Sequence, residues 1–226
     1  MNKKKGIIIG VLAVALVMVV GYAILSDTLT INGTATAEGN LDMQIISAEV
    51  TGEVGSTGAT TQVNSEDNNN SLTINIPKLE YPGAYVDVTY KVKNAGSVPA
   101  LYDSYEITGE TDRIKAGFNI LHMFYEPEDE TTETIRIYWD ENNNTTEEES
   151  VTITFKLNYV QTNDKESACA SLKEFQTTTD ECASWILFGD DCPVNKYDLN
   201  HDTFINSIDV TNVNDNIYMQ LQCPSE

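Results

Sequence analysis

The polar stretch "DLNHDTFINSID", from Asp198 to Asp209, carries side chains that could bind a cation. If Asp198 is position 1, side-chain oxygens stand at positions 1, 3, 5, 9 and 12, and position 7 offers its main-chain carbonyl. The residues at these positions are Asp198, Asn200, Asp202, Phe204, Asn206 and Asp209. Calcium prefers about six to eight oxygen ligands, and an EF-hand loop of about 12 residues supplies them from these positions. The spacing therefore predicts that this loop binds Ca²⁺.

The residues around these ligands refine the prediction. Position 6 of such a loop is usually glycine because its backbone takes a positive φ, and Thr203 in its place costs roughly 1 kcal/mol. We therefore expect a lower affinity for calcium than glycine would give. Ile205, at position 8, is expected to point into the apolar interior. Beyond the loop, apolar residues recur at intervals of three and four up to Leu221, which predicts a helix from about Ser207 with one apolar face.

All the cysteines lie in the same part of the chain, at Cys169, Cys182, Cys192 and Cys223. Four cysteines in an exported segment of this size predict two disulfides, which would stabilise a module too small to rely on its core. Spacing alone leaves three pairings open. We expect Cys192–Cys223, which would bracket the cation loop, together with Cys169–Cys182. Free, buried thiols are the alternative.

The N-terminus indicates export. Three lysines, Lys3 to Lys5, precede an uncharged apolar run from Gly6 to Leu25. This run is longer than a signal-peptide core of about 7–15 residues and close to the roughly 20 that span a bilayer. Small residues before a possible cleavage between Ala23 and Ile24 favour a signal peptide, whereas an uncleaved run would anchor the chain in the membrane through residues 6–25. In both cases the remaining chain is extracellular or at the cell surface.

The charge of the exported part narrows its partners. After Leu25 the chain has 10 basic residues against 35 acidic ones, a net charge of about −25. Such a charge repels nucleic acid and anionic lipid, and it attracts divalent cations and basic surfaces. Binding to DNA or RNA is therefore excluded from the functions that we consider.

Period-two alternation of apolar residues dominates the chain up to about residue 162 and predicts strands with one buried face. The expected strands are 27–37, 41–50, 71–76, 84–94, 133–139 and 150–160, with weaker signals at 100–109 and 118–124. The polar tract 51–70 is expected to be a surface loop. Short strands separated by turns predict an antiparallel β-sandwich. The chain thus divides into a leader or anchor at 1–25, a sandwich at 26–162 and a small helical calcium-binding module at 163–226.

Two segments, "GYAILSDTLTINGTATAEGNLDMQI" and "LEYPGAYVDVTYKVKNAGSVPALY", resemble the exported camelysin/TasA family of Gram-positive bacteria. The resemblance covers roughly residues 1–160. It implies a jelly-roll-like β-sandwich, processing by a dedicated signal peptidase, and kinship with subunits of biofilm matrix fibres. In fibre-forming members the segment after the cleavage site completes the sheet of the next subunit, and here that role would fall to Asp27–Ala37. The alternative is that this segment is the first strand of its own sandwich.

Camelysin has been described as a zinc-dependent peptidase, so enzymatic function has to be weighed. A zinc site needs three or four ligands at set spacing. The chain offers only His122 and His201 as histidines and has no H-E-x-x-H motif. The acidic pair Glu128/Asp129 and the triplet Glu147 to Glu149 could be imagined as a glycosidase acid and base, but we interpret them as solvated loops. We therefore expect no enzyme activity, and a camelysin-like metallopeptidase is the weakest alternative.

The calcium loop followed directly by "INSID" and a helix resembles a type I dockerin repeat. The resemblance implies that Asp198, Asn200, Asp202, Asn206 and Asp209 bind calcium and that Ser207 and Ile208 contact a cohesin module. A dockerin normally has two such repeats, and residues 163–196 contain no second loop of this spacing. We therefore expect either a matrix or surface protein with a calcium-dependent C-terminal interaction module, or a component that docks to cohesin in a polysaccharide-degrading assembly.

Overall fold

The structure is a computed structural model that describes residues 39–141, 147–184 and 192–224. The apolar leader, the cleavage site between Ala23 and Ile24 and the expected strand 27–37 lie outside the described residues. Within the described ranges, no helix is long and apolar enough to cross a membrane.

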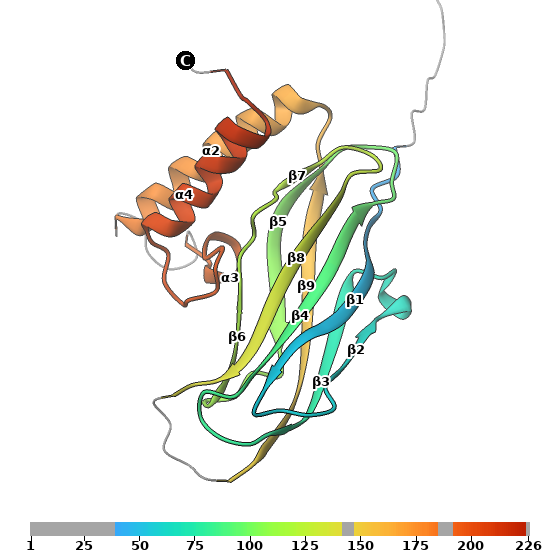
Figure 1. The fold of residues 1–226 in the computed structure, drawn as a ribbon. Coiled ribbons are helices and arrows are strands. Elements are labelled where there is room, and N and C mark those ends of the chain that lie inside the picture. The colour runs from blue at the N-terminus through green and yellow to red at the C-terminus, as the bar shows by residue number, and fades with distance from the viewer. Residues whose placement is uncertain (1–38, 142–146, 185–191, 225–226) are drawn as a thin grey trace, which may run out of the picture. The chain divides into compact units, whose positions relative to one another are not determined.

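Two antiparallel sheets confirm the predicted β-sandwich (Figure 1). The first sheet has the order β1 (Met43–Val54), β4 (Tyr85–Asn94), β8 (Glu130–Trp139) and β6 (Ile114–Phe118). The second has the order β2 (Thr60–Val63), β3 (Ser71–Leu79), β9 (Glu149–Gln161), β5 (Ala100–Thr108) and β7 (Phe124–Tyr125). The clearest period-two segments of the sequence, 84–94 and 150–160, coincide with β4 and β9.

Two sequence expectations about strands are wrong. The tract 51–70 is not simply a loop, because it contains the end of β1, the strand β2 and a short 3₁₀ helix, Ser65–Asp67. The segment 118–124 is not one strand, because β6 ends at Phe118 and β7 begins at Phe124. The connection 119–123 follows an irregular path. Its Ile120 and Met123 amides bond to the C-terminal segment, and its Met123 carbonyl accepts from the Tyr102 amide of β5.

The core lies between the sheets and is built from the alternate residues that the pattern selects. Ile135 and Val88 are partners in the first sheet, Ile74 and Ile153 are partners in the second, and all of them are fully buried. At one end of the core the apolar side chains give way to buried tyrosines. Tyr90, for example, packs edge-on against Phe155 with the ring centroids 5.6 Å apart.

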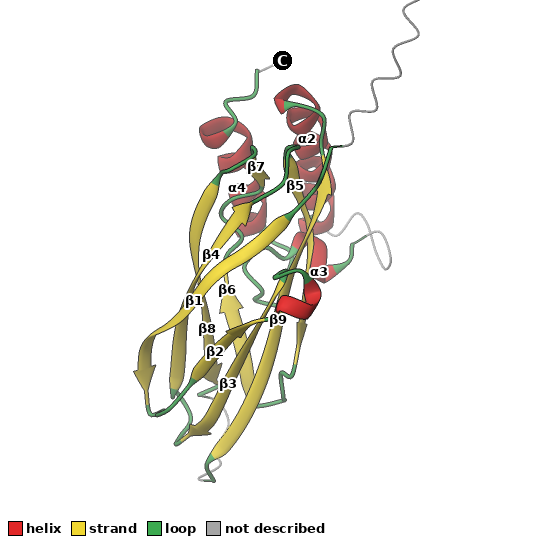
Figure 2. Cartoon of the chain, turned by 90° about the vertical axis from the view of Figure 1, so that its right-hand side faces the viewer, coloured by secondary structure: helices red, strands yellow, loops and turns green. Residues whose placement is uncertain are grey.

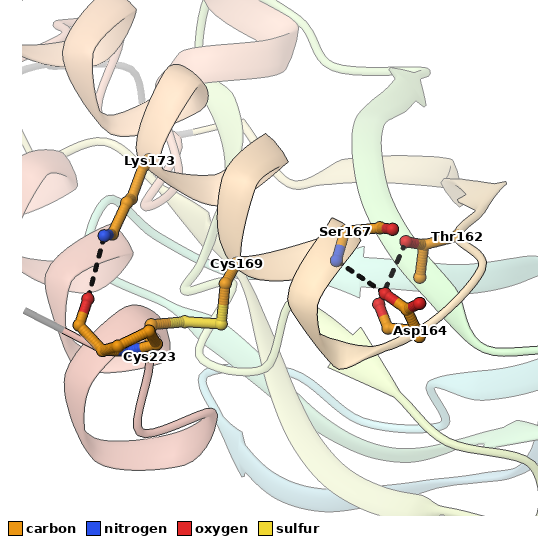
Figure 3. Close-up of a disulfide and its surroundings, with 7 residues drawn as sticks. Thr162, Asp164, Ser167, Cys169, Lys173 and Cys223 are labelled. Carbon is orange, nitrogen blue, oxygen red and sulfur yellow. Dashed lines mark hydrogen bonds between the residues drawn. A yellow bond between two sulfur atoms is a disulfide. The ribbon is translucent and has the colours of Figure 1, made fainter.

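The C-terminal segment forms helices that pack beside the strands (Figure 2). They are α2 (Lys165–Ala183), α3 (Val194–Tyr197), α4 (Ser207–Asp215) and the π-helical turn η3 (Asn216–Gln220). α2 begins where Asp164 accepts a hydrogen bond from the Ser167 amide at 2.7 Å (Figure 3). The apolar face expected beyond the loop is confirmed, because Val213, Ile217 and Leu221 are buried.

Two disulfides are present as expected, but their pairing differs from the expected one. Cys169 bonds to Cys223 and Cys182 bonds to Cys192 (Figure 3 shows the first of them). The reason is α2, which carries both Cys169 and Cys182. A helix rises about 1.5 Å per residue, so these two cysteines are roughly 20 Å apart, whereas bridged Cα atoms must lie within about 7 Å of each other. Each therefore bonds to the cysteine nearest its own end of α2.

Candidate metal centre

The candidate calcium loop joins two short helices that fix its ends. Asp198 follows α3, and its amide donates to the Val194 carbonyl at 2.9 Å. Asp209 lies in the first turn of α4. Both aspartates are fully buried. Between them the buried residue Leu199 accepts a backbone hydrogen bond from the Ile120 amide at 2.8 Å, which ties the loop to the connection between β6 and β7.

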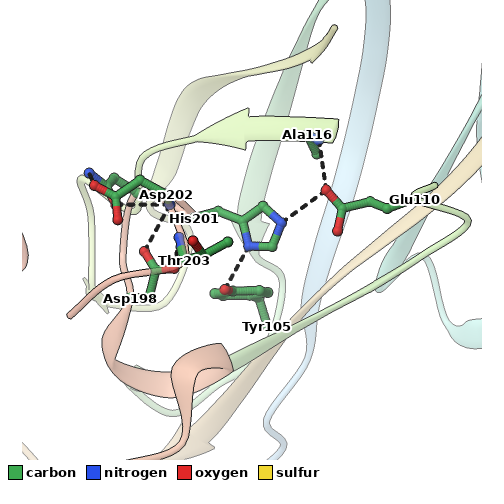
Figure 4. Close-up of polar contacts among 8 residues, drawn as sticks. Tyr105, Glu110, Ala116, Asp198, His201, Asp202 and Thr203 are labelled. Atoms are coloured by element: carbon green, nitrogen blue, oxygen red, sulfur yellow. Dashed lines mark hydrogen bonds and ion pairs between the residues drawn. The ribbon is translucent and has the colours of Figure 1, made fainter. Parts of the chain in front are cut away.

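The two buried carboxylates hold the loop closed through backbone amides. Asp198 accepts from the amides of Asp202 (3.1 Å) and Thr203 (2.8 Å), as Figure 4 shows. Asp209 accepts from the amides of Leu199 (2.7 Å) and Asn206 (2.8 Å). Positions 1 and 12 of the predicted register thus lie at the centre of the loop. Each carboxylate oxygen accepts one of these bonds and retains a further lone pair.

The remaining side-chain ligands of the register converge on Asp202. Its Oδ2 accepts hydrogen bonds from the side-chain amides of Asn200 (3.0 Å) and Asn206 (3.2 Å). Asn206 also caps α4, because its Oδ1 accepts from the Ile208 amide at 2.8 Å. This cap explains why the helix begins at Ser207, as the sequence predicted. Phe204 contributes nothing through its side chain, which is largely exposed.

Charge in the loop is poorly compensated. Burial raises the pKa of Asp198, and the negative charges of Asp209 and Asp202 raise it further, against the backbone hydrogen bonds that lower it. Burial likewise raises the pKa of Asp209, with the charge of Asp202 adding to the effect and backbone hydrogen bonds opposing it. Buried carboxylates of like charge are stabilised in their ionised form by a nearby cation.

The donor atoms suit a hard cation. All side-chain donors of the register are carboxylate or amide oxygens, the donor type that calcium prefers, and none is the cysteine or histidine of which structural zinc sites are built. Among the described residues, no group of three or more His, Cys, Asp or Glu side chains is gathered closely enough to hold a metal ion. A calcium site in this loop would use two asparagines and a main-chain carbonyl besides the aspartates. It therefore fits calcium in donor chemistry and in the burial of its end ligands.

Position 6 adopts the strained backbone that the sequence suggested. Thr203 has φ +75°, in the left-handed region where a β-branched residue is a true outlier. Its side chain is exposed, so that replacing it removes little packing.

We expect Thr203→Gly to raise the free energy of unfolding by about 1 kcal/mol, measured by urea denaturation. The same change at Thr211, an exposed residue inside α4, should lower the free energy of unfolding by about 0.3 kcal/mol. A loss at both positions would contradict the expectation.

His201, at position 4 of the loop, attaches the loop to the sandwich. The sequence did not predict this contact. The His201 side chain is 10 % exposed, and its Nδ1 lies 2.7 Å from the Tyr105 hydroxyl in β5. Its Nε2 lies 3.2 Å from Glu110, in the turn between β5 and β6 (Figure 4). The imidazole also stacks on Phe118 of β6, with ring centroids 5.1 Å apart. Because Tyr105 and His201 are 96 residues apart, no local pattern could have predicted this contact.

Further contacts join the same two parts of the molecule. Lys196 in α3 forms an ion pair with Asp103 of β5 at 2.7 Å. The Met123 amide donates to the side chain of Asn216 at 2.8 Å. β5 pairs with β7 only at Ala100 and Leu101. Farther along, the Tyr105 carbonyl accepts from the side chain of Asn195 in α3 at 3.3 Å. The C-terminal segment therefore covers the edge of β5 that no strand protects.

Removing His201 tests how much this attachment contributes. We expect His201→Ala to lower the free energy of unfolding by about 2–3 kcal/mol, because it leaves the Tyr105 hydroxyl and the Glu110 carboxylate without their partner and removes the ring from Phe118. Although burial opposes the ionisation of Glu110, hydrogen bonds from His201 and the Ala116 amide lower the pKa of that carboxyl. Urea denaturation measures the change, and the matched variant His122→Ala should cost less than half as much.

The two histidines do not form a common site. His122 lies in the connection between β6 and β7 and packs edge-on against Tyr125, with ring centroids 4.6 Å apart, and burial lowers its pKa. Three of the acidic residues considered above pair with cations: Glu128 with Lys93, Glu148 with Lys78 and Glu149 with Arg113. The implied cohesin contacts are accessible, because Ser207 is exposed and Ile208 is 51 % exposed.

Comparison with protein-family models, curated proteins and solved structures finds no match to this chain.

Proposed function

We propose that this chain is an exported, non-enzymatic protein of the cell surface or extracellular matrix whose C-terminal loop binds calcium. The observation that carries the proposal is the pair of fully buried carboxylates, Asp198 and Asp209, which close a loop with oxygen donors in an EF-hand register. Calcium would supply positive charge to a site where carboxylates repel one another. Bound there, it stabilises the folded loop and, through His201, the contact of the loop with β5 and β6.

The surroundings of the loop support an extracellular role. Two disulfides near the C-terminus are typical of proteins that fold in an oxidising compartment. The β-sandwich is the architecture that the resemblance to the camelysin/TasA family implies, and a jelly-roll-like topology is part of that proposal. Self-assembly would use Asp27–Ala37, which lies outside the described residues, as a strand added to a neighbouring subunit.

A second function is favoured by the exposed apolar side chains beside the loop. Phe204 is 64 % exposed and Ile208 is 51 % exposed, and Ile208 is a residue that the dockerin resemblance assigns to the cohesin contact. In this alternative, Ser207 and Ile208 bind a cohesin-like partner, and calcium orders the surface that presents them. The chain would then be one component of a larger surface assembly.

Sedimentation velocity separates these functions. Residues 24–226 with oxidised cysteines are compared in millimolar calcium and in chelator, with Asp198→Ala as the variant that should not respond to calcium. Growth into large species in calcium supports a matrix subunit. A monomer in both conditions that is more compact in calcium supports a docking module. Identical sedimentation of the parent chain with and without calcium contradicts the proposed calcium loop.

A further inference from the structure

The edge of β8 is open over half of its length. β6 pairs with β8 only from Ile114–Trp139 to Phe118–Ile135, after which the chain leaves the sheet. The β8 residues from Glu130 to Thr134 therefore have only β4 as a neighbour. Unpaired strand edges are templates on which another chain can add a strand.

The hydrogen bonds at the end of β8 show in which direction its unpaired backbone amides and carbonyls point. The Trp139 amide donates to Ala84 on the β4 side, whereas the Asp140 amide donates to Arg113 on the β6 side. Because backbone groups alternate along an antiparallel strand, the amides and carbonyls of Thr132 and Thr134 point toward the β6 side. Within the described residues no other backbone group bonds to them.

A groove of about 560 Å³ lies along this edge. Thr132, Glu133 and Thr134 form its β8 side, and Phe118, Asn119 and Leu121 are among the residues opposite. The groove exists because the connection after Phe118 turns toward the C-terminal segment, where Ile120 and Met123 make the backbone contacts described above. The space that a paired strand would fill is thus left open by the fold itself.

Glu133 gives the groove a charge. Glu133 alternates along β8 with the same face as the buried residues Ile135 and Ile137. Its side chain therefore lies on the inner face of the sheet, opposite Tyr90 of β4. No described residue forms a hydrogen bond or an ion pair with its carboxylate. The nearby cation Arg136 is bonded to Asp87 through two hydrogen bonds of 2.7 and 2.8 Å.

The isolation of Glu133 has a measurable effect on stability. Burial raises the pKa of Glu133 from 4.5 to about 7. The folded chain then binds more protons than the unfolded chain between these two pH values, so the contribution of Glu133 to stability falls as the pH rises from one to the other.

We expect Glu133→Gln to raise the melting temperature at a pH above 7 and to leave it nearly unchanged near pH 4.5. The facing hydroxyls of Tyr90 and Tyr125 stay protonated throughout, because burial raises their pKa values.

We propose that this groove binds an extended peptide segment of a basic partner protein, which pairs with β8 at Thr132 and Thr134 and places a lysine or arginine opposite Glu133. Main-chain hydrogen bonds to the open edge would give affinity, and the cross-strand charge pair would give specificity. The net charge of about −25 on the exported chain attracts such a partner from a distance. Ser207 and Ile208, the implied cohesin contacts, are not among the residues that line the groove, whereas Asn200 of the candidate calcium loop is one of them.

The chain's own segment Asp27–Ala37 is a poorer occupant. It contains threonines and apolar residues that suit a strand, but it has no lysine or arginine, and Asp27 adds a negative charge. Placed along β8, it would leave Glu133 uncompensated. Charge therefore distinguishes a basic partner from a second copy of this chain.

The test uses the full chain in mild detergent with its disulfides oxidised. Fluorescence anisotropy compares labelled peptides of about nine alternating threonine and valine residues that carry either lysine or glutamate at the centre. We expect the lysine peptide to bind about tenfold more tightly. Glu133→Gln should reduce this preference to about twofold or less, whereas Glu130→Gln, on the same strand outside the groove lining, should leave it unchanged. Hydrogen exchange at the amides of Thr132 and Thr134 should slow when the lysine peptide binds.

A second variant tests the strand pairing itself. Thr134→Pro removes an amide that points into the groove and no bond to β4, so the sheet should tolerate it while binding of the lysine peptide is lost. Equal binding of the two peptides, or unchanged exchange at Thr132 and Thr134 in the bound state, overturns the proposal. Tighter binding of a peptide with the sequence of residues 27–37 than of the lysine peptide also overturns it, because the occupant is then a second copy of this chain.

Discussion

Replacing Cys169 and Cys223 together by alanine is expected to lower the free energy of unfolding by about 4 kcal/mol. The bond joins residues that are 54 positions apart, so its loss releases a long closed loop in the unfolded chain. It also links α2 directly to the chain end beyond η3, where Lys173 donates to the Pro224 carbonyl at 2.9 Å. Such a loss is a large part of the total stability of an ordinary domain. Urea denaturation of the oxidised proteins measures it.

The second disulfide provides the control. Cys182 and Cys192 are 10 positions apart, so the same chain-entropy argument gives about 3 kcal/mol for their double replacement. The Cys169/Cys223 variant should therefore be the less stable of the two. The opposite order would show that loop closure does not govern the contribution of these bonds.

Asp209→Ala and Asp198→Ala are expected to remove the calcium-dependent rise in melting temperature. In the parent chain, calcium at about a hundred times its dissociation constant should add about 2.7 kcal/mol. Asp209→Ala should be destabilising even in chelator, because it leaves the buried amide of Leu199 and the amide of Asn206 without an acceptor, at about 1–3 kcal/mol for each buried group. Thermal unfolding in calcium and in chelator measures both effects.

A matched variant separates loss of the site from loss of general negative charge. Asp112 is an exposed aspartate in the turn before β6, so Asp112→Ala should keep the full response to calcium. If Asp198→Ala or Asp209→Ala still gains as much melting temperature from calcium as the parent chain does, the assignment of ligands in the loop is wrong.

The sequence predicted the strands whose buried face is made of large apolar residues. In β4 and β9, valines, isoleucines and aromatic residues alternate with polar residues. This pattern predicts a strand with one buried face. The connection after Phe118 contains equally apolar residues, Ile120 and Met123, yet it is not a strand. The partners of its Ile120 and Met123 amides lie 79 and 93 residues away in the chain, where no local pattern can indicate them.

The disulfide pairing could not be predicted because α2 gives a weak helical signal. Its buried face consists of Ala168, Cys169, Leu172, Thr179 and Cys182, which are mostly small or polar residues. Without that helix, the expected pairing was the one in which Cys192–Cys223 brackets the cation loop and Cys169–Cys182 closes a small loop before it. In the candidate site, spacing alone selects the proposed ligands because they belong to one loop, and their binding of calcium stays a prediction. Spacing was insufficient for His201, whose partners belong to β5, to β6 and to the turn between them.

The bond between Cys169 and Cys223 also determines how the chain would carry a pulling force. Tension applied between the sandwich and the end of the chain passes from Cys223 across the disulfide to Cys169 and on into β9. The 53 residues between the two cysteines lie inside a covalent ring and are bypassed. The loop from Asp198 to Asp209 is part of that ring, so a force that unfolds a helix outside the ring would leave the residues of this loop in place.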